Sequence, residues 1–327
     1  MLPISNIFKV VMNIGGLFSG VGGIELGFKN AGFNILWSNE IDNNAVQTLK
    51  SNFSHNIYHC DIALLNGSKL DDIDILVAGF PCQAFSIAGY RKGFDDDRGN
   101  VFFHIIRIIK ELENKPNIIF LENVKNLLSH DKGQTFQTIK TLLEDVGYHI
   151  KYSILNSKDH GNTPQNRERI YIVGFKNISQ YEKFSFPEEI PLKKSIQSIL
   201  ENNTDNAFYY TEEKYPKYYN MLKNSMNNKN TIYQLRRIYV RENKNNICPT
   251  LTANMGTGGH NVPLILDKEN KIRKLTPKEC FSFQGFPKNF KLPKNMANSH
   301  LYKQAGNSVS VKVIERIAKK IKETINS

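Results

Sequence analysis

Hydrophobic and polar positions divide the first 175 residues into short apolar runs and segments with apolar residues at helical spacing. The apolar runs end in glycines or polar residues and predict buried strands at KVVMNIGGLF, ILWSNEI, DILVAGFP and IIFLENV. The segments IELGFKNAGF and VFFHIIRIIKELE repeat apolar residues with the spacing of a helix. This alternation predicts an α/β fold, with a parallel sheet between helices and ligands bound at the carboxyl ends of the strands.

The pattern changes near residue 177. From there to about residue 270 the chain is rich in Asn, Lys and Tyr and has weak periodicity, which predicts a separate, loop-rich domain. Near the end the chain becomes helical again, because Ile314, Ile317, Ile321 and Ile325 fall on one stripe. No apolar run reaches 18 residues and no secretory signal is recognisable, so we expect no membrane span and a location in the cytoplasm.

Charge is distributed unevenly along the chain. Residues 1–150 hold 13 Lys and Arg against 16 Asp and Glu, whereas residues 151–327 hold 30 against 15. The basic second half predicts a polyanionic partner, although a generally basic surface would give the same balance. The four cysteines (Cys60, Cys82, Cys248 and Cys280) form no CxxC pair, and no histidines have metal-ligand spacing, so neither a metal site nor disulfides are expected.

Three features in the first 61 residues suggest a cofactor site. The turn Gly20-Val21-Gly22-Gly23 follows a strand and opens a helix, but Glu25 stands where a dinucleotide fingerprint needs its third glycine. Glu40 ends the next strand, where an acid commonly binds ribose hydroxyls, and Asp61 follows the third. Each acid alone is more typical of a turn or a helix cap than of a ligand site. Together, in this order, they indicate a cofactor that contains a nucleoside.

A cysteine in the segment GFPCQAFS, residues 79–86, is the strongest candidate for chemistry. Cys82 follows a proline at a strand end, and the next segment, GYRKGFDDDRGN, is polar and rich in glycine. This context predicts a reactive thiol beside a loop that closes as a lid. The alternative is a buried structural cysteine.

Five segments, in order, are similar to motifs of the bacterial DNA cytosine-C5 methyltransferases of type II restriction–modification systems. They are GFPCQAFS, LENV at 121–124, QNRERIYIVGF at 165–175, RKLTPKECFSFQGFP at 273–287 and YKQAGNSV at 302–309. The resemblance spans nearly the whole chain. It implies a Rossmann-like large domain that binds S-adenosyl-L-methionine, formed by residues 1–177 and 300–327. It also implies a small target-recognition domain, residues 178–299, with double-stranded DNA in the cleft between the two.

The resemblance assigns catalytic roles. Cys82 matches the nucleophile that adds to carbon 6 of cytosine, and Glu122 matches the acid that acts at ring nitrogen N3. Of Arg167 and Arg169, one is expected to donate to the O2 atom of the base and the other to support Cys82 or the backbone.

The resemblance also assigns cofactor roles. Phe18 matches the ring against the adenine, Glu40 the ribose-binding acid and Asp61 the adenine-binding acid. Asn307 matches a position near the methionine moiety, which implies that residues from about 300 onward pack on the large domain. Three positions depart from the family pattern: Gly16, where Asp is frequent, Ile41, where Trp is frequent, and Ala88, where Ser is frequent. The remaining expected cofactor residues are Ser19, Gly20, Gly22, Gly23, Ile41 and Pro81.

DNA recognition is expected from two places. The lid at 83–102 carries Arg91, Lys92 and Arg98, which are suited to phosphate contacts. The segment 233–263 resembles that of family members that read a GC-containing palindrome such as GCNGC, and Gln234 resembles a residue that fills the space left by a flipped cytosine. In this segment the candidate DNA-binding residues are Gln234, Arg236, Arg237, Arg241 and Thr250.

The family resemblance further implies a monomer that protects DNA from a cognate restriction endonuclease without necessarily binding it. The main alternative is a tRNA cytosine-C5 methyltransferase, which one branch of this fold family contains. A relative that only binds DNA and a thiol hydrolase are less well supported. The hydrolase would need a histidine base near Cys82, for which His104, His130 and His160 are the candidates.

Overall fold

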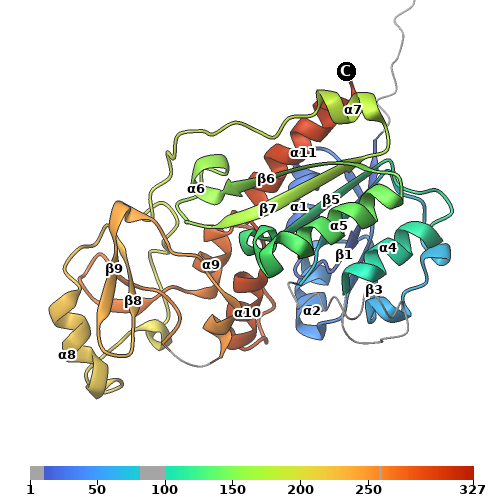
Figure 1. Ribbon diagram of the computed structural model, residues 1–327. Helices are drawn as coiled ribbons and strands as arrows, with labels where there is room; N and C mark the ends of the chain where they lie inside the picture. The colour runs from blue at the N-terminus through green and yellow to red at the C-terminus, as the bar shows by residue number, and fades with distance from the viewer. Residues whose placement is uncertain (1–10, 82–100, 258–259) are drawn as a thin grey trace, which may run out of the picture.

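A seven-stranded sheet forms the centre of the larger part of the molecule. The computed structural model describes residues 11–81, 101–257 and 260–327. The strand order is β3-β2-β1-β4-β5-β7-β6 (Figure 1). The strands are β1 (Asn13–Leu17), β2 (Asn34–Glu40), β3 (Asn56–His59), β4 (Ile75–Gly79), β5 (Ile118–Val124), β6 (His149–Asn156) and β7 (Glu168–Phe175).

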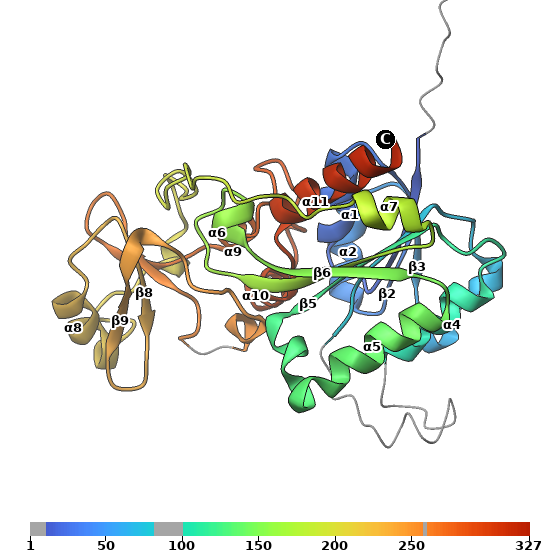
Figure 2. The same cartoon turned by 45° about the horizontal axis from the view of Figure 1, so that its top comes forward.

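Side chains of the central strands alternate between two hydrophobic cores, one on each face of the sheet. In β4, Ile75 and Val77 join one core, whereas Leu76 and Ala78 join the other. Both faces are therefore covered, which explains why these strands read as continuous apolar runs. Helices α4 (Val101–Glu111) and α5 (Gln134–Asp145) lie on one face; α1 (Gly23–Asn30), α2 (Asn43–Asn52) and α11 (Val311–Ile325) lie on the other (Figure 2).

The expectation of a parallel sheet fails for one strand, β7. β7 lies between β5 and β6 and is antiparallel to both. Only residues 157–167 connect β6 to β7, including α6 (Ser157–His160), and such a connection is too short for a parallel crossover. The start of β7 therefore lies beside the end of β5. The QNRER motif reaches the sheet edge at the beginning of a strand rather than at its carboxyl end.

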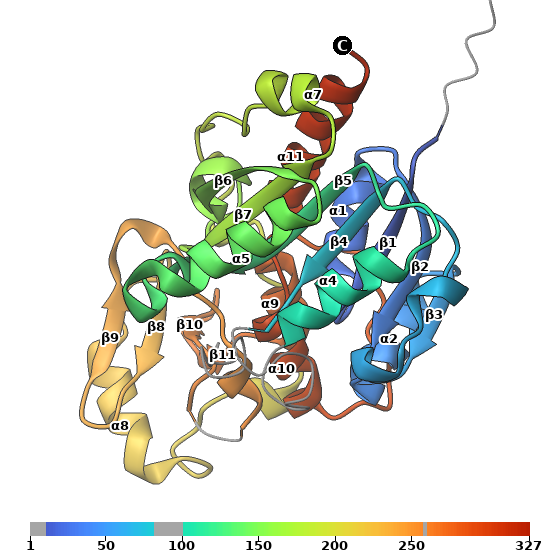
Figure 3. The same cartoon turned by 45° about the vertical axis from the view of Figure 1, so that its right-hand side comes forward.

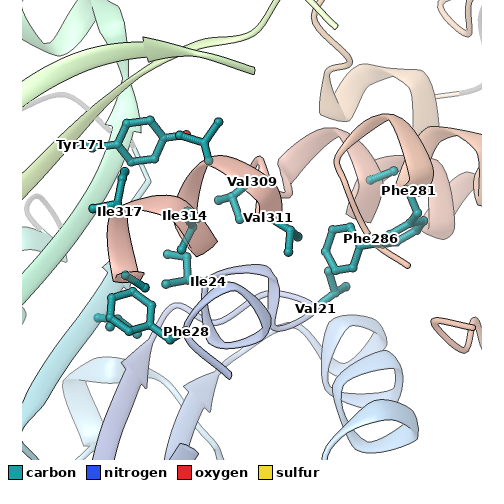
Figure 4. Packing of buried hydrophobic residues seen from close by; sticks show 14 of the residues in the cluster. Val21, Ile24, Phe28, Tyr171, Phe281, Phe286, Val309, Val311, Ile314 and Ile317 are labelled. Carbon is teal, nitrogen blue, oxygen red and sulfur yellow. The ribbon is translucent and has the colours of Figure 1, made fainter. Parts of the chain in front are cut away.

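The C-terminal helix packs on the large domain, as the resemblance implies. Ile314, Ile317 and Ile321 of α11 are fully buried, and Figure 4 shows Ile314 and Ile317 beside Ile24 and Phe28 of α1. Helix α10 (Asn298–Asn307) precedes it and returns the chain from the small domain. The last helix in the sequence thus completes the layer that the first helix begins.

The smaller part of the molecule contains a second sheet of four short strands, ordered β11-β10-β8-β9 (Figure 3). Its own core includes Tyr233 and Leu264. Helix α7 (Ile178–Lys183) instead contacts β6 and β7 of the large sheet, and the division of the chain at residue 178 stays a prediction. The elements of the smaller part are α8 (Pro216–Ser225), β8 (Ile232–Leu235), β9 (Val240–Asn243), β10 (Leu264–Leu266), β11 (Ile272–Lys274) and α9 (Pro277–Phe283).

Candidate active site

A cavity of about 400 Å³ lies where β1, β2, β4 and β5 end and β7 begins. Its wall combines the turn after β1, the ends of β2, β4 and β5, and the segment around the end of α10. Residues far apart in the sequence therefore converge on one space. The predicted site residues in its lining are Phe18, Ser19, Gly20, Gly23, Glu40, Ile41, Pro81, Glu122, Arg167, Arg169 and Asn307.

The turn after β1 is held against the end of β2 by a buried carboxylate. Glu40 accepts hydrogen bonds from the backbone N–H groups of Gly20 (2.6 Å), Ile41 (2.9 Å) and Asp42 (2.7 Å). The turn needs a left-handed backbone, with φ of 54° at Gly20 and 83° at Gly22. The glycines and Glu40 therefore act together to fix the shape of this wall.

Glu122 and Arg169 form an ion pair inside the cavity. Arg169 Nε lies 3.2 Å from Glu122 Oε1, but no hydrogen bond to this oxygen is aligned among the described residues. Burial raises the pKa of the Glu122 carboxyl, although Arg169 and Arg167 act to lower it. Such a carboxyl holds a proton more readily than an exposed one and has a free oxygen to exchange it. Glu122 is thus suited to proton transfer at a bound molecule.

Arg167 has different surroundings. It is buried and donates hydrogen bonds to the carbonyl groups of Leu251 (3.0 Å), Gly306 (3.4 Å) and Ser308. Burial lowers the pKa of this guanidinium to about 9. Arg167 therefore connects the start of β7 to residues 233–263 (the recognition segment predicted from the sequence) and to the end of α10. Arg169 is the arginine beside Glu122.

Two predicted cofactor residues lie outside the cavity lining. Asp61 is exposed, and its carboxylate caps a short 3-10 helix by accepting from the Ala63 N–H (2.9 Å). Gly22 packs against Leu49 and Phe53, where any side chain would clash. His104, His130 and His160 also do not line the cavity. The predicted residues Cys82, Arg91, Lys92 and Arg98, and the departure Ala88, lie outside the described part of the chain.

Several cavity residues were not expected from the sequence. The Asn123 side chain donates to the Phe80 carbonyl (3.0 Å) and so fixes the backbone directly before Pro81. Gln304 accepts from Thr48 (2.9 Å) within the YKQAGNSV motif. The motif itself could have indicated Gln304, but only Asn307 was predicted from it as a cofactor residue. The other cavity residues contributed by α10 and its end are His300, Lys303, Gly306, Ser308 and Val309.

The recognition segment is attached directly to the QNRER motif. The Thr250 hydroxyl donates to the Asn166 carbonyl (2.6 Å), and Cys248 forms a backbone bridge with Gln165. Further along, β8 and β9 form a hairpin in which Gln234 pairs with Arg241. Its turn exposes the predicted DNA-binding residues Arg236 and Arg237 together with the apolar side chains Ile238 and Tyr239.

Two absences hold for the described ranges 11–81, 101–257 and 260–327. No helix there has both the length and the apolar character needed to cross a bilayer. No cluster of three or more His, Cys, Asp or Glu side chains there is placed to bind a metal ion.

Comparison with known proteins is consistent across sequence and structure. The chain is 56% identical over 315 residues to Type II methyltransferase M.Bsp6I of Bacillus sp. (strain RFL6), covering 95% of this chain and 98% of the relative. It is 36% identical over 326 residues to Type II methyltransferase M.HhaI of Haemophilus parahaemolyticus, covering 95% and 94%. S. pombe Dnmt2 methyltransferase shares the fold, with a TM-score of 0.73 at 21% identity over 97% of this chain and all of the other. The family model for C-5 cytosine-specific DNA methylase matches residues 12–323. The predicted resemblance and α/β fold class are confirmed, and the chain belongs to the C-5 cytosine-specific DNA methylase family.

Proposed function

We propose that this protein transfers the methyl group of S-adenosyl-L-methionine to carbon 5 of a cytosine flipped out of a short specific site in duplex DNA. The observation that carries the proposal is the Glu122–Arg169 pair, which faces the same cavity as the turn after β1. The Glu122 carboxyl and the glycine-rich turn to which we assign the cofactor therefore line the same cavity. Pro81 also lines this cavity, and Cys82 is the next residue in the sequence.

The reaction requires activation, because carbon 5 of cytosine is a weak nucleophile. The Cys82 thiolate adds to carbon 6 while Glu122 supplies a proton to ring nitrogen N3, which makes carbon 5 an enamine carbon. The raised pKa of Glu122 suits this donation. We assign to Arg169, which lies beside Glu122, the hydrogen bond to the O2 atom of the base. After methylation the proton on carbon 5 leaves and the thiol is eliminated, which restores the enzyme.

The cavity residues fit S-adenosyl-L-methionine, which supplies an electrophilic methyl group when bound. The hydroxyl oxygens of Ser19 and Ser308 are buried at the cavity and have no hydrogen-bond partner among the described residues. Because buried hydroxyl groups normally form hydrogen bonds, these two are suited to bind a polar ligand. We assign the adenine to Phe18 and Ile41, the ribose to Glu40 and the methionine moiety to Asn307. Asp61 stays a candidate for the adenine amino group.

Duplex DNA is the polyanion that best fits the basic second half of the chain. The exposed Arg236, Arg237 and Arg241 lie on the hairpin, and Thr250 lies where the recognition segment meets the QNRER motif. We assign to Gln234, on the same hairpin, the role of filling the space left by the flipped base. We propose GCNGC as the site, with protection from a restriction endonuclease as the biological role and a monomer as the acting form. The lid residues Arg91, Lys92 and Arg98 would add phosphate contacts.

A tRNA substrate is less well supported. The solved structures named Dnmt2 are only 21–22% identical to this chain and so share its fold alone. The curated relatives at 36–56% identity are named type II methyltransferases. The difference in similarity favours DNA.

Transfer of a labelled methyl group tests the proposal. Purified protein is incubated with labelled S-adenosyl-L-methionine and a GCNGC duplex, a duplex with that site scrambled, or tRNA. We expect label only in the GCNGC duplex, recovered as 5-methylcytosine. Label in the scrambled duplex alone would refute the site, and label in tRNA alone would refute the DNA function.

A further inference from the structure

A further buried carboxyl, besides Glu40 and Glu122, lies beside the turn after β1, and the mechanism above does not use it. Glu25, in the first turn of α1, is 1% exposed, and its Oε2 atom has no hydrogen-bond partner among the described residues. A side chain at Gly16 would overlap the Glu25 carboxylate and come within 2.9 Å of Ser19 Oγ. Glu25 and Ser19 therefore lie around the same small space beside β1.

No cation balances this carboxyl in the described ranges. The nearest charged residue on the same helix, Lys29, lies over the Phe53 ring. On α11, which packs against α1, Lys312 pairs with Glu315 (2.8 Å). From β2 only another acid, Glu40, acts on it. A buried, unpaired carboxyl is costly unless it stays protonated or a ligand supplies the missing positive charge.

The pKa of Glu25 is that of a buried carboxyl without a cationic partner. Burial raises its pKa to about 7, the Ser19 hydroxyl and the backbone N–H of Glu25 lower it, and Glu40 raises it further. The carboxyl is thus balanced between its two forms near neutral pH. A small change in the surrounding charge is sufficient to shift that balance.

Ser19 connects this carboxyl with the cavity. Its hydroxyl lines the cavity and lies close enough to Glu25 to lower the pKa of that carboxyl, although it forms no aligned hydrogen bond among the described residues. A hydroxyl can donate one hydrogen bond and accept others. If Ser19 donates to an ionised Glu25, its lone pairs are left for a cationic donor in the cavity. If Ser19 accepts from a protonated Glu25, its own hydrogen is directed elsewhere and opposes such a donor.

We propose that Glu25 is a positioning residue that couples cofactor binding to the release of a proton. The inference rests on the proposed function. Binding of the α-ammonium group of the cofactor favours ionised Glu25, which orients the Ser19 hydroxyl to accept from that ammonium. The proton of Glu25 passes to the solvent. Gly16 suits this arrangement because a side chain there would displace the Glu25 carboxyl from its present position.

Binding of S-adenosylhomocysteine, measured by calorimetry at pH 6 and pH 8, tests the inference without turnover. Its α-ammonium group stays protonated over this range. We expect affinity to be about tenfold weaker at pH 6, since each pH unit below the pKa of Glu25 costs about tenfold. Two buffers with different ionisation enthalpies should reveal the released proton.

Three variants and one ligand sharpen the test. Glu25→Gln should abolish the pH response, Ser19→Ala should weaken it, and the exposed control Glu323→Gln should keep it. 5′-Methylthioadenosine, which lacks the ammonium group, should bind the natural protein equally at both pH values. This ligand contrast decides the matter alone if Glu25→Gln fails to fold.

The failures are distinguishable. An equal pH response in the natural protein and Glu25→Gln, or in both ligands, would overturn the inference and leave the proposed function intact. Absence of S-adenosylhomocysteine binding at either pH would overturn both.

Discussion

Two buried ion pairs, one in each part of the molecule, are built in opposite ways. In the smaller part, both Glu279 oxygens accept from the Arg273 guanidinium, at 2.8 and 2.7 Å, and Glu279 also accepts from the Thr276 and Glu201 N–H groups. In the cavity, Arg169 Nε lies 3.2 Å from Glu122 Oε1, and this oxygen has no aligned donor among the described residues.

The difference separates a structural pair from the pair that we propose to be reactive. The Arg273–Glu279 pair has every oxygen engaged, and Glu279 also completes the capping box of α9. Such a pair holds a fold together but has no capacity left for a substrate. In the Glu122–Arg169 pair, Glu122 Oε1 has no aligned hydrogen-bond donor among the described residues, and the pKa of the carboxyl is raised. We propose that this oxygen exchanges a proton with a bound base. Hydrogen-bond completeness, more than burial, distinguishes the two.

The largest expected effect comes from removing the reactive carboxyl. Glu122→Gln should slow single-turnover methylation by roughly 10²–10⁴-fold, because the amide cannot supply a proton. Cofactor affinity and the free energy of unfolding should change little. An unchanged single-turnover rate would remove Glu122 from the chemistry and erase the contrast between the pairs.

Glu279→Gln should act on stability instead. It leaves the Arg273 charge buried without its partner, and breaking a buried pair costs about 3–5 kcal/mol. Urea unfolding would measure the loss, with Glu323→Gln of the exposed Lys320–Glu323 pair as the control, expected below about 1 kcal/mol. A loss for Glu279→Gln as small as that of the control would contradict the structural role.

A smaller effect concerns pH. Because the native pKa of Glu122 is raised, the folded protein binds a proton that the unfolded chain releases, so this group lowers stability as pH rises through that window. The free energy of unfolding of Glu122→Gln relative to the natural protein should therefore increase with pH above the ordinary range for Glu. Glu25 is common to both proteins and cancels. Urea unfolding at several pH values measures the difference, and a constant difference would show that Glu122 is not perturbed.

The sequence could predict features that depend on local residues, but not those that depend on contacts far apart in the chain. Glu40 and Glu122 were predictable because each ends an apolar run and matches a family motif, and local sequence determines both features. The antiparallel β7 was not predicted, because strand direction depends on the length of the connection and on neighbours far away in the sequence. The four-stranded sheet escaped detection because its strands are three or four residues long. Glu25 was noted only as a departure from a glycine motif, and its burial required the packing of α1 to be known.

Covalent trapping of the base tests the central claim most directly. A GCNGC duplex with 5-fluorocytosine at the target has no proton to release from carbon 5, so the thiol adduct should persist once the methyl group has been transferred. With S-adenosyl-L-methionine present, we predict a stable protein–DNA adduct at Cys82, identified by mass spectrometry of the linked peptide. It should be absent in Cys82→Ser, slow to form in Glu122→Gln and unaffected in folded Glu279→Gln. Methylation of ordinary duplex by a protein that forms no such adduct would contradict the account.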